Sequence, residues 1–216
     1  MTASLGTAHS PNGEPPGGNR PLSDANHSLR FCRKQSYVQT MAKQALLIVD
    51  LQAGLFSTPR FDAVNLIRRL NEMADRFRKR GAPVILVQQC GPEGDPLHPS
   101  QPGHALHEDL VVEQSDVRIA KESCDAFLNT KLANYLLSNG VDEVVVTGFA
   151  TEFCVDTTIR SALAHGFKTV VPKDGHSTAD RAHLSAAKII EHHNETWRWL
   201  LSPAGPARIV RCADVG

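Results

Sequence analysis

The sequence predicts an α/β fold, a doubly wound, six-stranded parallel sheet with helices on both faces. From residue 44 onward, short apolar runs of strand length alternate with longer segments of helical periodicity. The strand candidates are apolar throughout rather than alternating, as expected for strands that are covered on both faces. Ligands of such sheets bind beyond the carboxyl ends of the strands, at the point where strand order reverses. Residues that follow the strands are therefore the candidates for a functional site.

The elements follow one another in a regular order. "ALLIVD" (45–50) begins the sheet, and 61–81 follows as an amphipathic helix that ends at Gly81. A Pro- and Gly-rich connection, 91–115, is long enough to be a functional loop. The other strands are expected at 83–89, 117–121, 142–148, 168–174 and 207–211. The other helices are expected at 130–140, 152–166 and 180–201.

The first 40 residues differ from the rest in composition. They are rich in Pro, Gly, Ser and Asn and cannot bury enough apolar surface to fold, so we expect residues 1–40 to be a disordered extension. A transit peptide would need more Arg and fewer acidic residues than this stretch contains. Met41 is an alternative start of the protein, and 41–216 has the size of a single domain.

The composition limits which classes of binding partner and which cellular compartment are expected. Basic and acidic residues balance at 23 each, and no basic stripe predicts binding to nucleic acid or to a membrane surface. No apolar run approaches the roughly 20 residues of a membrane-spanning helix. The cysteine count is odd, without closely spaced pairs or a secretory leader, which predicts reduced thiols in the cytoplasm. The five are Cys32, Cys90, Cys124, Cys154 and Cys212.

Three strand-end residues stand out for their chemistry. Cys154 lies in the first turn of a predicted helix, where backbone N–H groups favour a thiolate. Asp50 follows four apolar residues, so burial would raise its pKa; the alternative is a carboxylate that only orders a loop. Lys121 ends a short strand and is either a solvated lysine or a buried ammonium that pairs with Asp50 and holds the cysteine as thiolate.

The spacing from Cys154 to Arg160 also matches the C-x5-R pattern of a phosphatase loop. Such a loop needs backbone N–H groups that converge on the phosphate, with an arginine completing the cradle. The intervening "VDTTI" has no glycine, and Asp156 would repel a phosphate dianion. We therefore expect Arg160 to be an ordinary helix residue.

Three long segments resemble the isochorismatase-like cysteine hydrolases. They are "ALLIVDLQAGLF", "KESCDAFLNTKLANYLLSNGVDEVVVTGFATEFCVDTTIRSALAHGFKTVVPKDGHST" and "AHLSAAKIIEHHNET". The resemblance implies an Asp50–Lys121–Cys154 triad, a cis peptide bond between Phe149 and Ala150, and an oxyanion hole built from the Ala150 and Cys154 backbone N–H groups. It also implies a homodimer or homotetramer.

The expected strand order indicates which of the three triad residues can lie close together. In a Rossmann-like order, 3-2-1-4-5-6, strands one and four flank the switch point, which brings Asp50 beside Cys154. Lys121 would start about 10 Å away, two strand spacings from Asp50, and must lean across. Whether it does so is left open by the sequence.

No metal and no organic cofactor are expected. Nicotinamidases of this family begin their metal site with D-x-H after the second strand, and that motif is missing from "QQCGPEGDPLHPSQPGHALHEDL". His98, His104 and His107 could gather a metal in principle, but their Pro- and Gly-rich spacing gives no ligand geometry, and we expect surface histidines.

The leading hypothesis is a hydrolase that cleaves a non-peptide C–N bond of a small molecule, such as an amide, lactam or ureido group, through an acyl-thioester on Cys154. Phe127, Phe153 and Gln89 are the candidate walls of its pocket. One alternative is isochorismatase-type vinyl-ether hydrolysis, which uses the aspartate as an acid and needs no thiolate. Another is a non-catalytic oligomeric protein that binds a small molecule.

Overall fold

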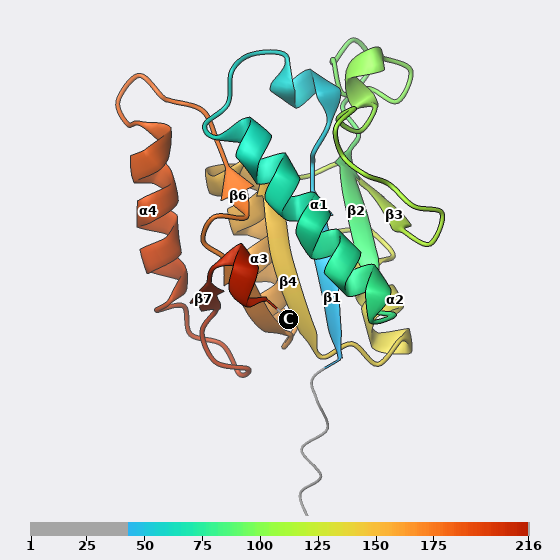
Figure 1. Ribbon diagram of the computed structural model, residues 1–216, viewed down its shortest axis with the longest axis vertical. Helices are drawn as coiled ribbons and strands as arrows, with labels where there is room; N and C mark the ends of the chain where they lie inside the picture. The colour runs from blue at the N-terminus through green and yellow to red at the C-terminus, as the bar shows by residue number, and fades with distance from the viewer. Residues whose placement is uncertain (1–42, 216) are drawn as a thin grey trace, which may run out of the picture. The chain divides into compact units, whose positions relative to one another are not determined.

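The computed structural model describes residues 43–215, and their strands form one parallel sheet in the order β3-β2-β1-β4-β5-β7 (Figure 1). The predicted fold class and the strand order at the switch point are confirmed. The disorder predicted for residues 1–40 lies outside the described residues. The strands are β1 (Gln44–Val49), β2 (Val84–Gln89), β3 (Val117–Lys121), β4 (Glu143–Phe149), β5 (Lys168–Pro172), β6 (His176–Ser177) and β7 (Arg208–Val210).

The two-residue strand β6 was not predicted. β5 ends at Pro172, and after a turn the chain returns as β6 to pair with the end of β4, Gly148 beside His176. A strand this short has no periodicity to read in a sequence. It continues the sheet beyond the end of β5 and lies next to the loop that follows β4.

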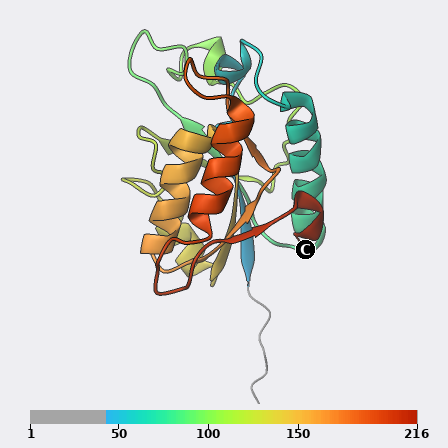
Figure 2. The same ribbon diagram turned by 90° about the vertical axis from the view of Figure 1, so that its left-hand side faces the viewer.

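Helices cover both faces of the sheet. Helix α1 (Ala63–Lys79) packs on one face, whereas α3 (Asp156–Ala164) and α4 (Ala186–Trp197) lie on the other, as Figure 2 shows. The fourth helix, α2 (Leu132–Ser138), belongs to the same core as α3 and α4. Successive β1 residues alternate between two cores: Leu46 and Ile48 pack with α1, and Leu47 and Val49 pack with the opposite helices. Both faces of β1 are buried, which explains its apolar sequence.

Helix α4 is shorter than the predicted 180–201. It begins at Ala186, whose backbone N–H donates to Asp180 Oδ1 at 2.8 Å, and residues 180–185 form a turn with a bridge between Arg181 and Leu184. An aspartate that accepts a backbone N–H of a first turn fixes the start of a helix. The turn therefore replaces the expected first helical turns and carries Arg181 to the end of the sheet where ligands bind.

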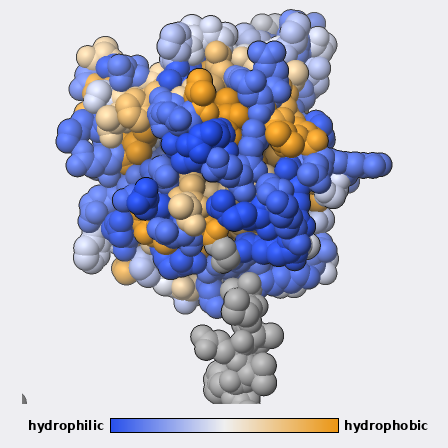
Figure 3. All heavy atoms as spheres, in the orientation of Figure 1, coloured by the Kyte–Doolittle hydropathy of each residue, from blue (hydrophilic) through white to orange (hydrophobic). Residues whose placement is uncertain are grey.

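The face that carries α1 is mostly hydrophilic, with small apolar groups between polar ones (Figure 3). This matches the amphipathic pattern of α1, whose buried residues are Leu66, Ile67, Leu70, Met73, Ala74 and Phe77. Within residues 43–215, no helix combines the length and apolar character needed to cross a bilayer.

Candidate active site

The last residues of β4, just before the loop that carries Cys154, include a glycine that the backbone requires. Gly148 has φ +118°, and a Cβ built on it would lie 2.1 Å from the Val49 carbonyl oxygen, so only glycine lets β4 pass this close to β1. The peptide bond between Phe149 and Ala150, at the end of β4, is cis, as the family resemblance implied. The chain then enters the turn that carries Cys154.

That turn differs from the predicted α-helix. Residues Thr151–Val155 form a π-helical turn, with the Val155 N–H donating to the Ala150 carbonyl at 3.2 Å, and α3 starts only at Asp156. Single π turns occur often at functional sites. Here the turn places Cys154, with Ala150, on the wall of a cavity at the carboxyl ends of the strands.

Asp50 follows the last residue of β1 and adopts φ +52°, a left-handed conformation that aspartate tolerates better than most residues. Its side chain is only 1% exposed, and neither carboxylate oxygen has a well-aligned hydrogen bond to any residue in 43–215. Burial raises the pKa of Asp50 above its usual value, although the nearby Lys121 ammonium opposes this rise. The carboxylate is thus held dry, in contact with the Lys121 ammonium and beside the Cys154 thiol.

Lys121, at the end of β3, reaches across β2 to this carboxylate. Its Nζ atom lies 2.7 Å from Asp50 Oδ2 and is completely buried. The ammonium also donates to Gln89 Oε1 at 2.6 Å, to the Ser123 carbonyl at 3.0 Å and to Cys154 Sγ at 3.3 Å. The structure therefore brings Asp50, Lys121 and Cys154 together, and Gln89 holds the ammonium between them.

The electrostatics of Cys154 differ from the expected thiolate. Burial raises the pKa of the Cys154 thiol far above its usual value, the negative charge of Asp50 raises it further, and Lys121 only partly opposes them. The resting site therefore pairs a neutral thiol with an Asp50–Lys121 ion pair. In such an arrangement a thiolate forms when a carboxylate takes the proton during attack, rather than beforehand.

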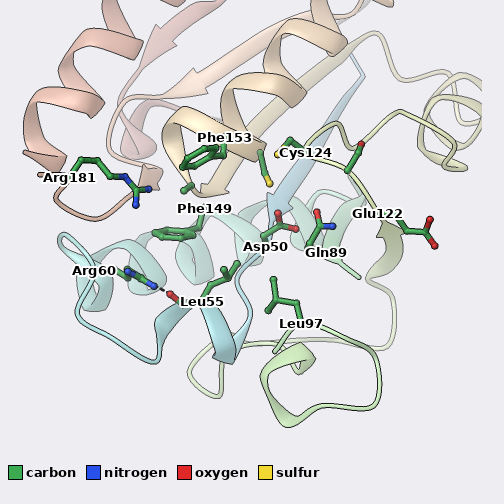
Figure 4. Close-up of a pocket in the computed structure, with 13 residues that line it drawn as sticks. Asp50, Leu55, Arg60, Gln89, Leu97, Glu122, Cys124, Phe149, Phe153 and Arg181 are labelled. Atoms are coloured by element: carbon green, nitrogen blue, oxygen red, sulfur yellow. Dashed lines mark hydrogen bonds between the residues drawn. The ribbon is translucent and has the colours of Figure 1, made fainter. Parts of the chain in front are cut away.

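Asp50 and Cys154 line a cavity of about 450 Å3, and the buried Lys121 contacts both of these residues. Figure 4 shows Asp50 at this cavity. Gln89 and Phe153 line it, as predicted. Phe127 does not, and this prediction was wrong: Phe127 is buried in the core, stacked on the rings of His165 and Phe167 at 4.8 and 5.9 Å. The apolar run that contains Phe127 packs against α3 and the start of β5 rather than facing the carboxyl ends of the strands.

Several residues that line the cavity were not predicted from the sequence. They are Leu55, Arg60, Leu97, Glu122, Ser123, Cys124, Phe149 and Arg181. Leu55 and Arg60 belong to the connection after β1, a class of loop that the fold marks as ligand-binding, so their position gave a usable signal. Arg181 gave none, because it was placed inside a predicted helix.

The Pro- and Gly-rich connection closes one side of the cavity with Leu97. Two buried glutamines hold it down: Gln52 Nε2 and Gln88 Nε2 both donate to the His104 carbonyl at 3.0 Å. Its three histidines have separate surroundings. His98 Nδ1 contacts Ser100 Oγ at 2.7 Å, His104 Nε2 lies 3.5 Å from Cys90 Sγ, and His107 packs edge-on against Phe56. Within residues 43–215, no group of three or more His, Cys, Asp or Glu side chains is arranged to hold a metal.

Arg160 has no part in the cavity. Its Nε atom donates to both carboxylate oxygens of Asp156, one turn earlier, at 2.9 Å, and its side chain is exposed on α3. The arginine therefore does not join Cys154 to form a phosphate cradle.

Comparison with known proteins agrees with this geometry. A sequence model of the Isochorismatase domain matches residues 44–194. Streptothricin hydrolase of Streptomyces noursei is 36% identical over 141 residues, which cover 63% of this chain and 55% of that protein. Maleamate amidohydrolase of Pseudomonas putida is 34% identical over 96 residues, 43% of this chain and 42% of that protein. The chain thus matches only about half the length of these two relatives.

A solved structure of an isochorismatase family protein has the same fold. It superimposes with a TM-score of 0.71 at 31% sequence identity, covering 78% of this chain and 98% of that one.

Proposed function

The chain belongs to the isochorismatase family, and on this premise we propose that it is a cysteine hydrolase that cleaves a non-peptide C–N bond of a small molecule. One observation carries the proposal. A buried carboxylate and a thiol line a cavity large enough for a small molecule, and a fully buried ammonium contacts both of them. The names of the two relatives, a hydrolase and an amidohydrolase, support the same reaction class.

In the proposed first step, Cys154 Sγ attacks the carbonyl carbon of an amide or ureido group while Asp50 takes the thiol proton. The raised pKa of the thiol makes this transfer necessary, and the Asp50 carboxylate lies beside the thiol, where it can accept the proton. Lys121 keeps Asp50 ionised before the step and faces the sulfur as negative charge forms there.

The tetrahedral oxyanion would be bound by the backbone N–H groups of Ala150 and Cys154, both of which belong to residues on the cavity wall. When the C–N bond breaks, the leaving nitrogen takes the proton from Asp50 and departs as amine or ammonia. Water then attacks the thioester, Asp50 accepts its proton, and the acid is released with Cys154 Sγ reprotonated.

The test is a panel of small amides and ureides assayed with wild type, Cys154→Ala and Asp50→Asn. We expect both variants to lose turnover, and intact mass measurement during slow turnover to show an acyl adduct that maps to Cys154. Cys124→Ala is the matched control, because this exposed thiol lines the same cavity. Turnover that survives in Cys154→Ala overturns the thioester mechanism. If only Asp50→Asn is inactive, vinyl-ether chemistry replaces it.

A further inference from the structure

The cavity has a cationic end that the proposed chemistry does not use. Arg60 and Arg181 line it on the side of Phe149 and Phe153, as Figure 4 shows, and Asp50 lies on the other side of Phe149 in that view. The Arg60 guanidinium lies 5.4 Å from the centre of the Phe149 ring, and that of Arg181 lies 5.3 Å from the centre of the Phe153 ring. Two charged groups therefore border two aromatic walls.

The charge of Arg181 is already neutralised. Its Nε and Nη2 atoms donate to Glu152 Oε1 at 2.8 and 2.6 Å, and Glu152 is mostly buried. These two hydrogen bonds to one carboxylate oxygen hold the guanidinium in place and offset its charge. Arg181 thus forms part of the wall as a neutral pair with Glu152.

Arg60 has no such partner. Its Nε atom donates to the Leu55 carbonyl at 2.5 Å, and it forms no ion pair anywhere in the part of the chain that the structure describes. Neither terminal nitrogen of the guanidinium has an acceptor among those residues, so a planar pair of donors remains. The end of the cavity at Arg60 therefore carries one unpaired positive charge, because Arg181 and Glu152 cancel there. The acidic Glu122 lines the same cavity on the opposite side of Asp50, as Figure 4 shows.

We propose that Arg60 binds a carboxylate of the substrate, so that the enzyme hydrolyses amides or ureides whose acyl part ends in a monoanionic carboxylate. This inference rests on the proposed function and specifies its substrate class. Guanidinium donors match the two oxygens of a carboxylate, and a single positive charge suits a monoanion better than a phosphate dianion. Between Arg60 and Cys154 the walls are apolar, with Leu55, Phe149 and Phe153, which favours an unbranched apolar spacer.

The first experiment compares half-amides of succinic and glutaric acid with the corresponding diamides, in which a neutral carboxamide replaces the carboxylate. We expect wild type to prefer the half-amides, and Arg60→Gln to raise KM for them about tenfold or more with little change in kcat, because the carboxylate is bound alike in ground and transition states. Diamide kinetics should be unchanged. Arg68→Gln, which removes an exposed arginine paired with Glu72, is the charge-matched control and should behave as wild type.

A double variant separates the two arginines. Glu152→Gln combined with Arg181→Gln removes the neutral pair and leaves Arg60 in place. We expect its preference for half-amides to persist. Loss of that preference in the double variant, with no effect of Arg60→Gln, assigns the anion to Arg181 and overturns the proposal.

A binding measurement separates this inference from the hydrolase proposal. Calorimetric titration of Cys154→Ala protein with glutarate needs no turnover, and we expect Arg60→Gln in that background to weaken binding about tenfold or more. Binding that depends on Arg60 without hydrolysis of any amide leaves the inference standing and removes the proposed reaction. If half-amides and diamides are hydrolysed with equal efficiency and Arg60→Gln changes neither rate, the hydrolase proposal stands and the assignment of Arg60 is overturned. Folding of each variant is checked by circular dichroism.

Discussion

Lys121 Nζ lies 2.7 Å from Asp50 Oδ2, although strand β2 separates the two strands that carry these residues. The lysine side chain spans that gap because Gln89, at the end of β2, accepts a hydrogen bond from the same ammonium. Cys154 completes the group from the turn that follows β4, the strand on the far side of β1. Four neighbouring strands thus contribute to one buried charge arrangement, and its balance can be tested one residue at a time.

Replacing Asp50 should have opposite effects on turnover and on thiol reactivity. Asp50→Asn removes the proton acceptor, so we expect kcat to fall by a factor of roughly 10²–10⁴. It also removes the negative charge that raises the Cys154 pKa, so the thiol should ionise at lower pH than in wild type. Alkylation rates against pH, with Cys124→Ala as background, measure this. A thiol that ionises at higher pH in Asp50→Asn contradicts the assigned electrostatics.

Replacing Lys121 should destabilise the fold. Lys121→Met leaves the Asp50 carboxylate buried without a cation, and removing one partner of a buried ion pair costs roughly 3–5 kcal/mol. The loss in unfolding free energy should shrink as pH falls, because Asp50 then becomes neutral by protonation. Urea unfolding at several pH values measures both effects. Lys188→Met, at an exposed ion pair with Glu191, is the control and should change stability little.

Gly148→Ala should be among the most destabilising single-methyl additions in the chain. The new Cβ would lie 2.1 Å from the Val49 carbonyl oxygen, in a backbone conformation with φ +118°, so we expect a loss of more than about 4 kcal/mol or failure to fold. Gly140→Ala separates collision from conformation, since Gly140 has φ +67° with open space around it. That control should lose about 1 kcal/mol. Equal losses in thermal unfolding would show that the contact with Val49 is not decisive.

His176 should make the fold sensitive to mild acid. It lies in β6 between Thr151 Oγ1, 2.9 Å from Nδ1, and Asn194 Oδ1, 3.2 Å from Nε2, and burial lowers its pKa to about 4. The unfolded chain, with an ordinary histidine pKa near 6.5, binds the proton first, so stability declines as pH falls from about 6.5 and levels off below about 4. The full decline is roughly 3–4 kcal/mol, at about 1.4 kcal/mol for each unit of pKa.

Unfolding free energies at pH 7 and pH 4.5 test this histidine. His176→Gln should lose part of the pH dependence, whereas His183→Gln, at an exposed position, should keep the wild-type slope. An unchanged slope in His176→Gln would place the acid sensitivity elsewhere.

Much of the fold could be read from the sequence because its signals are local. Continuous apolar runs marked β1, β2 and β4 as covered on both faces, and strand order then put Asp50 beside the Cys154 loop. The homo-oligomer expected from the family stays a prediction, which light scattering would test. The short or irregular elements were not predicted from the sequence. β6 has two residues, the Cys154 turn is π-helical, and the first turns expected for α4 are a loop.

The sequence by itself determined the fold class and the strand-end positions of Asp50, Lys121 and Cys154. Tertiary structure alone decided that Lys121 reaches Asp50, that Phe127 belongs to the core, and that Arg60 and Arg181 border the cavity. The physical reason is how far apart in the chain the interacting residues lie. Strand and helix periodicity depends on neighbours within a few residues, whereas side-chain reach, burial and charge balance depend on residues that are distant in the chain and meet only after folding.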